Sequence, residues 1–408
     1  MNNGFFNSSL LESKAPQSIL PKCGACGLHK KCKSPKLSVA GKGKRKILII
    51  SERPSSKDDE AGRMYSSANP SLPLELALAK AGVNLERDCW LTSALICHTD
   101  KEPTSQQIEF CRPNLVKLIK ELKPDVIIPL GKSGITSIIP HLWKDNIGTA
   151  SRWYGFQIPS QQINSWVCPT FSPTHVHKMS FTNDAQKYAL KIHFRKHIQA
   201  AVELSGKPFD EIPDYQSQVE IIDRPTQAAK IIRKMIKRGG MVAFDYETDR
   251  LKPDNDESKI VSCAICYEGK KTIAYDWSGE AIEATKELLH SPLPKIACNL
   301  KFEDRWTRKH FGKRVRNWFW DTMLAAHVID QRPRITSIKF QSFVLLGASS
   351  YDDHIKKYLM SSGTSEVNNI HQIDRKELLT YNGLDAVLEY EVAMKQMEIL
   401  SYPKPKRL

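Results

Sequence analysis

No stretch of this 408-residue chain approaches the length of a membrane span, so a transmembrane protein is not expected. Residues 1–19 lack the basic-then-apolar build of a signal peptide, which argues against secretion. In an unsecreted chain, ten cysteines do not predict a disulfide framework, and buried thiols or metal ligands are the alternatives. We therefore expect a cytoplasmic protein.

Acidic residues are in deficit: 45 Asp and Glu face 60 Lys and Arg, for a formal charge of +15. This imbalance favours an anionic partner, with nucleic acid as the first candidate. Many basic proteins simply carry solvated lysines, so the charge alone does not decide the matter. The length fits two domains, each large enough for its own core.

The first half alternates apolar strand-like runs with segments of helical spacing, after an irregular polar stretch at 1–20 that we expect to be a mobile tail. The predicted strands are 47–51, 90–97, 125–131 and 166–171, and the predicted helices are 72–81 and 105–122. Such alternation predicts an α/β/α domain over residues 21–200, built on a mostly parallel sheet that is covered on both faces.

Two Cys-x-x-Cys pairs differ in their backbone context. Glycines flank Cys23 and Cys26, so the chain can turn both thiolates toward one metal or cluster. Cys263 and Cys266 have the same spacing inside a predicted strand, where their side chains point to opposite faces. We interpret the second pair as core residues.

Residues 21–195 resemble the iron–sulfur branch of the uracil-DNA glycosylase superfamily. The resemblance rests on the layout of Cys23, Cys26, Cys97 and Cys111 and on the sequence Cys111-Arg112-Pro113-Asn114-Leu115. It implies that the four cysteines hold a [4Fe–4S] cluster, while zinc at the same ligands and free thiols remain alternatives. Cys32 is a nearby spare.

The glycosylase motifs themselves depart from the family pattern. Glu52 and Tyr65 stand where the family has its water-positioning acid and its stacking aromatic residue, but Ser93 replaces the asparagine that contacts the base. The loop histidine is missing, and His175 lies three residues away from its place. These losses remove hydrogen bonds to a flipped base. The resemblance therefore implies a degenerate domain that holds DNA or a protein partner.

Residues 201–215 predict a linker, and 216–408 a second domain. A helix at 225–238 leads into a strand that ends near 248, and a hairpin follows at 261–267 and 271–277. A helix at 280–290 and a strand at 295–298 complete the start of an RNase H-like mixed sheet. The fold class is therefore α/β with two domains, of which the second has this mixed sheet.

Two carboxylates lie side by side on the strand that opens this domain. Asp245 and Glu247 project from one face, where they repel each other unless a cation sits between them. Magnesium and manganese are hard cations that take oxygen ligands. Two solvated acids at the end of a strand are the alternative.

Three ordered motifs then resemble the proofreading 3′–5′ exonuclease domain of family A DNA polymerases. They are Asp245-Tyr246-Glu247, an acid after Asn299 and Phe302, and Tyr381-x-x-x-Asp385. In the second motif the register favours Glu303, with Asp304 as second choice, because neighbouring helical residues point about 100° apart. Tyr381 and Asp385 share one face of a helix.

The resemblance implies two Mg²⁺ or Mn²⁺ ions held by Asp245, Glu247, Glu303 and Asp385, with Tyr381 orienting the attacking water. The implied substrate is a single-stranded or frayed DNA 3′ end, although RNA remains open. We find no polymerase domain after this one, so we expect a proofreading partner polymerase on another chain, in a bacterial or phage-infected cell. The alternatives are a bifunctional repair enzyme with active glycosylase and a non-catalytic DNA-binding accessory subunit.

Overall fold

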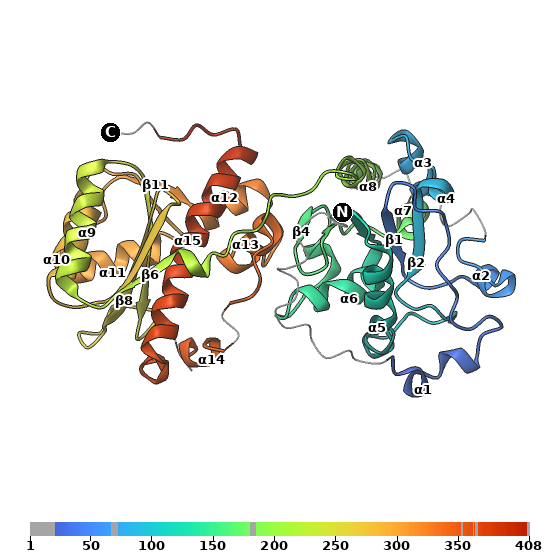
Figure 1. The fold of residues 1–408 in the computed structure, drawn as a ribbon, viewed down its shortest axis with the longest axis horizontal. Coiled ribbons are helices and arrows are strands. Elements are labelled where there is room, and N and C mark those ends of the chain that lie inside the picture. Colours follow the sequence, from blue (N-terminus) through green and yellow to red (C-terminus); the bar gives the residue numbers. More distant parts are fainter. Residues whose placement is uncertain are drawn as a thin grey trace. The chain divides into compact units, whose positions relative to one another are not determined.

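The computed structural model describes residues 21–66, 72–179, 185–351, 354–361, 363 and 366–405, without the side chains of 185–188. The predicted tail at 1–20 lies outside the described residues. The chain divides into two compact units, Met1–Ile212 and Pro213–Leu408 (Figure 1). The division falls within the predicted linker.

The first unit contains a five-stranded sheet in the order β2-β1-β3-β5-β4. Its strands are β1 (Ile47–Ser51), β2 (Cys89–Ser93), β3 (Val126–Pro129), β4 (Ile158–Ser160) and β5 (Ser165–Val167). All neighbouring pairs are parallel except β4 with β5, as a mostly parallel sheet requires. The two central strands β1 and β3 are short runs of β-branched and other apolar residues that are buried on both faces.

Helices cover both faces of this sheet. They are α1 (Cys23–Cys26), α2 (Ser56–Ala61), α3 (Leu72–Lys80), α4 (Leu85–Asp88), α5 (Ser105–Leu122), α6 (Gly131–Leu142), α7 (Pro173–Met179) and α8 (Ala185–Glu203). Leu74 of α3 and Phe194 of α8 share one core with the strands, and α5 and α6 pack together over the other face (Figure 1). The arrangement is the predicted α/β/α sandwich.

Strand β2 is shorter than predicted. It ends at Ser93, and Ala94 donates its amide to the carbonyl of Ser51 at 2.8 Å as the chain turns away. The Ser93 hydroxyl is 2.5 Å from the Leu95 carbonyl and closes this turn. The turn carries Cys97 out of the sheet and toward α1.

The second unit contains a six-stranded sheet in the order β11-β10-β7-β8-β9-β6. Its strands are β6 (Val219–Ile222), β7 (Val242–Thr248), β8 (Ile260–Tyr267), β9 (Lys271–Asp276), β10 (Lys295–Ala297) and β11 (Trp318–Asp321). β7, β8 and β9 are antiparallel, as predicted, and β10 runs parallel to β7. The two edge strands, β6 and β11, were not predicted.

Helices also cover both faces of the second sheet. They are α9 (Pro225–Arg238), α10 (Gly279–His290), α11 (Lys301–Phe311), α12 (Thr322–Ile329), α13 (Ile338–Leu346), α14 (Lys356–Leu359) and α15 (Arg375–Ile399). α9 and α10 pack on the face that contains Cys263, whereas α15 packs on the face that contains Cys266. The two cysteines thus lie in opposite cores, as the strand pattern predicted.

One long helix, α15, runs across the second sheet (Figure 1). It is a single helix of 25 residues that carries both Tyr381 and Asp385. Its Gly383 lies against edge strand β6, where an added Cβ would be 2.3 Å from Cγ1 of Val219. The helix therefore packs directly on the strand.

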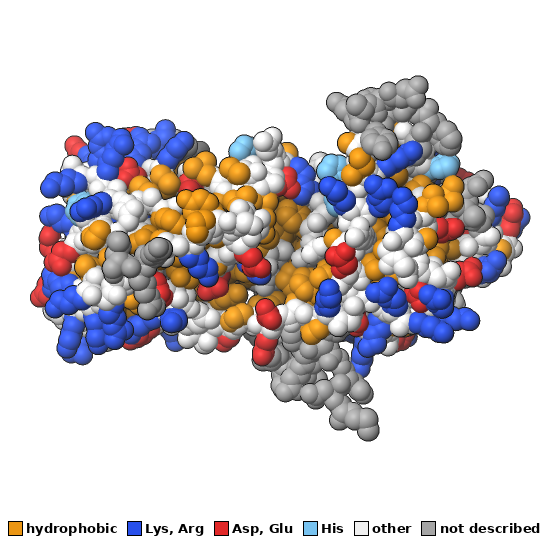
Figure 2. Space-filling view, turned by 90° about the horizontal axis from the view of Figure 1, so that it is seen from above, with side chains coloured by type: hydrophobic (Ala, Val, Ile, Leu, Met, Phe, Trp, Pro, Cys, Tyr) orange, Lys and Arg blue, Asp and Glu red, His pale blue; other side chains and the backbone are white. Residues whose placement is uncertain are grey.

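The surface of the second unit is rich in basic side chains. Lys and Arg gather at the end that carries α9 and α10 (Figure 2), and α9 alone contributes Lys230, Arg233, Lys234, Lys237 and Arg238. Arg233 pairs with Glu287 of α10 at 2.8 Å. Within the described residues, no helix combines the length and apolarity needed to cross a membrane.

Candidate active site

The middle of the second sheet brings three carboxylates together. Asp245 and Glu247 on β7 and Asp385 on α15 each offer an oxygen, and these oxygens lie within 4.8 Å of one another. Strand alternation directs Phe244 and Tyr246 into the opposite core, so the acids face α15. Small residues of β8 stand beside them, because Ala264 pairs with Asp245 and Ser262 with Glu247.

A fourth acid approaches from α11. Glu303 is 2 % exposed, and its Oε2 has no hydrogen-bond partner among the described residues. Its charge interacts with those of Asp245 and Glu247. Asp304 turns away and accepts hydrogen bonds from the Val315 amide at 3.0 Å and the Trp318 indole at 3.3 Å. The helix therefore presents Glu303, and not Asp304, to the other acids.

Asp321 fixes the start of the helix that carries Glu303. One of its oxygens accepts the amide of Asn299 and the other accepts the amide of Leu300, both at 3.1 Å. It also caps α12 through the amides of Met323 and Leu324. Asp321 thus has a supporting role: its oxygens are used by the backbone.

Helix α15 supplies a row of polar residues on the face that meets the acids. Asn382 donates to Oδ2 of Asp245 at 2.7 Å and accepts the hydroxyl of Ser262 at 2.9 Å, so it holds that carboxylate in place. Tyr381 precedes Asp385 by one turn, and Glu389 follows it by one turn.

Glu389 is a buried acid that the sequence reasoning missed. One oxygen accepts the amide of Cys298 at 3.1 Å, and the other has no partner within the described part of the chain. Its charge interacts with those of Asp245, Glu303 and Asp385. The signal was present in the sequence, because Tyr381, Asp385 and Glu389 follow one another at intervals of four residues.

Burial and mutual repulsion both oppose ionisation of these acids. Burial raises the pKa of Asp245 well above its ordinary value, and the charge of Asp385 raises it further. Burial likewise raises the pKa of Glu247 and of Glu303, and for both residues the Asp245 charge adds to the effect. A cation bound among these oxygens would favour the ionised carboxylates and so lower their pKa values.

The donor set therefore fits a hard divalent cation. All four expected ligands are carboxylates, which is the chemistry that magnesium and manganese prefer. A second observation supports a cation at this place. Glu303 and Glu389 each have a buried oxygen without a hydrogen-bond partner among the described residues, whereas buried polar atoms normally have partners.

Two further side chains border the acids and were not predicted. Lys339 donates to the Tyr381 hydroxyl at 3.0 Å, and its charge interacts favourably with Asp245 and Glu247. The Tyr351 hydroxyl donates to Oδ1 of Asp385. No spacing rule connects residues 339 and 351 with 381, so tertiary packing alone reveals them.

Four cysteines of the first unit lie together in one pocket. Cys23, Cys26, Cys97 and Cys111 line one pocket together with the apolar side chains of Leu28, Leu95, Ile96 and Phe110. Left-handed Gly27 ends α1, so the chain turns as the glycine flank predicted. Four thiols in an apolar shell fit an iron–sulfur cluster or zinc.

Hydrogen bonds to sulfur support this pocket. The Lys36 amide donates to Cys97 Sγ at 3.3 Å, and the Asn114 amide group lies 3.7 Å from Cys111 Sγ. Burial raises the pKa of Cys97 to about 11, and a contact with Cys32 contributes to the shift. Cys32 thus lies beside one of the four predicted ligands.

The acid expected from the glycosylase motif, Glu52, directly follows β1. Its Oε2 accepts the Ser172 hydroxyl at 3.1 Å, and an added Cβ at Gly131 would be 2.9 Å from Oε1. Burial raises the pKa of Glu52, whereas hydrogen bonds from Ser172 and from the Ser133 backbone lower it. This carboxylate is therefore already provided with partners.

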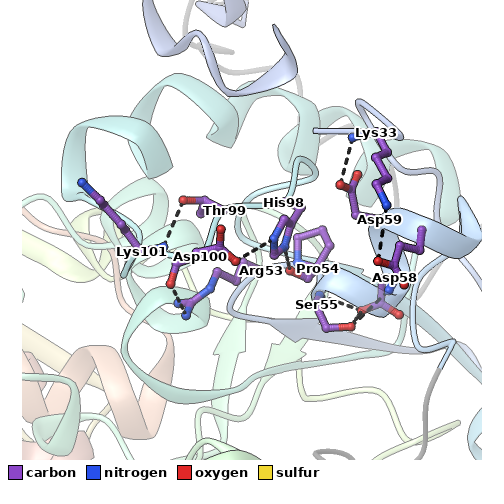
Figure 3. Close-up of polar contacts among 11 residues, drawn as sticks. Lys33, Arg53, Pro54, Ser55, Asp58, Asp59, His98, Thr99, Asp100 and Lys101 are labelled. Carbon is purple, nitrogen blue, oxygen red and sulfur yellow. Dashed lines mark hydrogen bonds and ion pairs between the residues drawn. The ribbon is translucent and has the colours of Figure 1, made fainter. Parts of the chain in front are cut away.

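The loop after Glu52 is held by His98, which follows β2, and by the start of α2 (Figure 3). His98 lies 2.9 Å from the Pro54 carbonyl, and Ser55 forms a capping box with Asp58 at the start of α2. Asp59 accepts the Lys33 amide at 2.9 Å, which holds the cysteine-bearing segment against α2.

In the described part of the chain, neither of the other two expected glycosylase residues forms a hydrogen bond with Glu52. Tyr65 packs against the first core, and its hydroxyl bonds to Ser51. His175 is exposed on α7, and no hydrogen bond in the described residues links it to Glu52 or Tyr65. Ser93 is buried, and its hydroxyl is used by the turn after β2.

Comparison with known proteins gives each unit a relative. Residues 39–197 match the uracil DNA glycosylase superfamily, and residues 219–400 match a 3′–5′ exonuclease family of the DNA polymerase A type. A Type-4 uracil-DNA glycosylase from Pyrobaculum aerophilum is 29 % identical over 187 residues, which is 44 % of this chain and 88 % of that protein.

A second relative is similar to a larger part of the chain. A DNA polymerase from Bacillus phage SP01 is 24 % identical over 346 residues, which is 77 % of this chain and 36 % of that polymerase. An alignment of this length includes parts of both units. Among solved structures, Escherichia coli RNase D matches with 13 % identity and a TM-score of 0.34, covering 44 % of each chain. The chain therefore joins a domain of the uracil DNA glycosylase superfamily to a 3′–5′ exonuclease domain of the DNA polymerase A type.

Proposed function

We propose that this protein is a metal-dependent 3′–5′ exonuclease that removes nucleotides from DNA 3′ ends and proofreads for a DNA polymerase on another chain. The observation that carries the proposal is the convergence of Asp245, Glu247 and Asp385 within 4.8 Å. DNA is favoured over RNA because the relative that aligns with both units is a phage DNA polymerase.

The expected ligands of two Mg²⁺ or Mn²⁺ ions are Asp245, Glu247, Glu303 and Asp385. When bound, such ions neutralise the phosphodiester and lower the pKa of an attacking water. The chain's own residues prepare the geometry. Asn382 fixes the Asp245 carboxylate at 2.7 Å, and the phenol of Tyr381 is placed one helical turn from Asp385, where it can hold a water by hydrogen bond.

The test is a nuclease assay with three 5′-labelled DNA substrates: single-stranded, fully paired, and paired with a mismatched 3′ end. With Mg²⁺ or Mn²⁺ we expect stepwise shortening from the 3′ end, faster on single-stranded and mismatched ends, and none with chelator. Equal digestion with and without metal would contradict the mechanism. If an RNA of the same sequence is digested faster, RNA and not DNA is the substrate.

We also propose that the first unit binds DNA or a protein partner without excising bases. Ser93 stands where the family has its base-reading asparagine, and its hydroxyl donates to the backbone carbonyl of Leu95 instead of facing a base, while Ser172 holds the Glu52 carboxylate. Uracil-containing DNA incubated with an Asp245→Ala, Glu247→Ala variant should contain no abasic sites. Abasic sites above background would establish the bifunctional repair enzyme instead.

Cys23, Cys26, Cys97 and Cys111 are the proposed ligands of a [4Fe–4S] cluster in this unit. Their apolar pocket supports the assignment. Protein purified without oxygen should be brown and contain about four irons per chain. Stoichiometric zinc and no colour would assign the zinc alternative.

A further inference from the structure

Lys339 is a cation at the edge of a site that otherwise collects acids. It lies in the first turn of α13, and its side chain is half-buried. Its Nζ donates to the Tyr381 hydroxyl at 3.0 Å and lies 4.9 Å from the centre of the Tyr381 ring. The same ammonium is 5.8 Å from the ring centre of Tyr351. It thus contacts the tyrosine of the exonuclease motif directly.

The chemistry of this contact has a definite direction. A lysine ammonium has three donors and no acceptor, so the phenol oxygen of Tyr381 must accept from it. The phenol's own proton is then left for another acceptor in the site. Without Lys339, the hydroxyl could rotate and present a lone pair instead. The contact therefore selects the donor orientation of Tyr381.

The position of Lys339 also has an electrostatic consequence. Its charge interacts with those of Asp245 and Glu247, which lie on the neighbouring strand. A fixed cation beside a reacting phosphodiester costs no reorganisation during the reaction. Lys357, whose Nζ lies 4.6 Å from the ring centre of Tyr358, is exposed instead of half-buried.

We propose that Lys339 is a positioning residue of the exonuclease site, which holds the Tyr381 phenol so that its proton is donated toward the attacking water. The inference rests on the proposed exonuclease function and deepens it. It assigns to α13 a part in the reaction that the three sequence motifs do not contain.

Two other roles predict different kinetics. If Lys339 only supports packing, its replacement lowers the melting temperature without affecting the reaction through Tyr381. If it only attracts the DNA backbone, its replacement raises KM, and the defect grows with salt. A positioning role lowers kcat and leaves KM nearly unchanged.

The experiment compares Lys339→Met, Lys339→Arg, Tyr381→Phe and the Lys339→Met, Tyr381→Phe double variant on single-stranded DNA with Mg²⁺. Lys357→Met is the matched control, because Lys357 is exposed and its Nζ also lies over a tyrosine ring, 4.6 Å from the centre of Tyr358, which is not part of the exonuclease motif. We expect Lys339→Met to lower kcat about 10- to 100-fold with KM changed less than about threefold. Lys339→Arg should recover part of the loss, and Lys357→Met should match wild type.

The double variant decides the coupling. If Lys339 acts through Tyr381, the double variant is no slower than the slower single variant. The inference is overturned if the kcat losses of the two single variants multiply in the double variant. It is also overturned if Lys339→Met changes only KM or leaves kcat unchanged. If Lys339→Met does not fold, Lys339→Gln takes its place under the same criteria. A wild-type protein without exonuclease activity overturns the proposed function and this inference together, whereas an active wild type with an unchanged Lys339→Met overturns the inference alone.

Discussion

Each unit places a carboxylate where a central strand of its sheet ends, but the two carboxylates have opposite surroundings. Glu52 follows β1 and accepts hydrogen bonds from Ser172 and the backbone of Ser133. Glu247 lies near the end of β7 among Asp245 and Asp385, and Glu303 nearby keeps an oxygen without a partner. Glu52 already has hydrogen-bond partners, whereas buried, mutually repelling acids must either hold protons or bind a cation.

The largest effect should come from removing the paired acids of β7. Asp245→Ala with Glu247→Ala should slow nucleotide release by at least about 1000-fold, because metal ligation and charge stabilisation are lost together. Glu52→Ala is the control in the other unit and should leave nucleotide release unchanged. A double variant that digests DNA at the wild-type rate would remove the distinction between the two units.

The next comparison separates two neighbouring acids of α11. Glu303→Gln should lower the rate by about 100-fold, because it removes a charge from the group of acids. Asp304→Asn should retain most activity and lower the melting temperature by a few degrees, because Asp304 accepts the Val315 amide and pairs with Arg314. If Asp304→Asn lowers the rate and Glu303→Gln does not, Asp304 is the acid of the site.

Divalent metal should stabilise the second unit selectively. Metal-free, the raised pKa values of Asp245, Glu247 and Glu303 mean that the folded state holds protons that the unfolded state has released. The contribution of these groups to stability is therefore present at low pH and is lost as the pH rises through the folded pKa values. At neutral pH, Mg²⁺ at 100 times its dissociation constant should add about 2.7 kcal/mol.

Amide hydrogen exchange provides the measurement for this prediction. Added Mg²⁺ should slow exchange in β7 and α15 and leave β1 and β3 of the first unit unchanged. The protection should be larger at pH 7 than at pH 5. Equal protection of both units would show that the metal acts elsewhere.

The smallest expected effect concerns Lys295 of β10, which is fully buried and donates to the Ser291 carbonyl at 2.6 Å. Burial lowers the pKa of Lys295 to about 7. Because the unfolded state binds the proton more tightly, this group destabilises the fold below about pH 7, and the penalty disappears as the pH rises toward the ordinary lysine value.

The first unit buries no lysine in its described residues, so this pH dependence should belong to the second unit alone. Lys295→Met should remove this pH-dependent penalty, so the unfolding free energy of the variant should rise less steeply than that of wild type between pH 6 and pH 10. Denaturant unfolding at several pH values, followed by exchange in β10, measures it. If the unfolding free energy of the variant changes with pH as steeply as that of wild type, Lys295 remains charged in the folded state.

The elements that follow local patterns were predictable. The helices at 105–122 and 225–238 agree with the structure residue for residue, because their caps and spacing are local. The order of Asp245, Glu303 and Asp385 likewise identified acids that the fold brings near one another. The edge strands β6 and β11 were missed, although β10, which has only three residues, was predicted as a strand.

The side chains around the acids were less predictable for a physical reason. Lys339 and Tyr351 reach the site from α13 and the segment after it, and their roles depend on contacts with residues more than 30 positions away. Asn382 lies within the predicted motif, but nothing in the sequence shows that its amide holds Asp245. Such partners are set by packing between elements, which periodicity does not describe.

The contact between Gly383 and Val219 gives the Tyr381-to-Asp385 segment a steric requirement beside its chemical one. A methyl group at position 383 would meet the Val219 side chain at 2.3 Å. Either the Val219 side chain or helix α15 would then have to move, and a shift of the helix would carry Tyr381, Asn382 and Asp385 with it. The distance between the Tyr381 phenol and the β7 carboxylates is thus set in part by a residue that has no side chain.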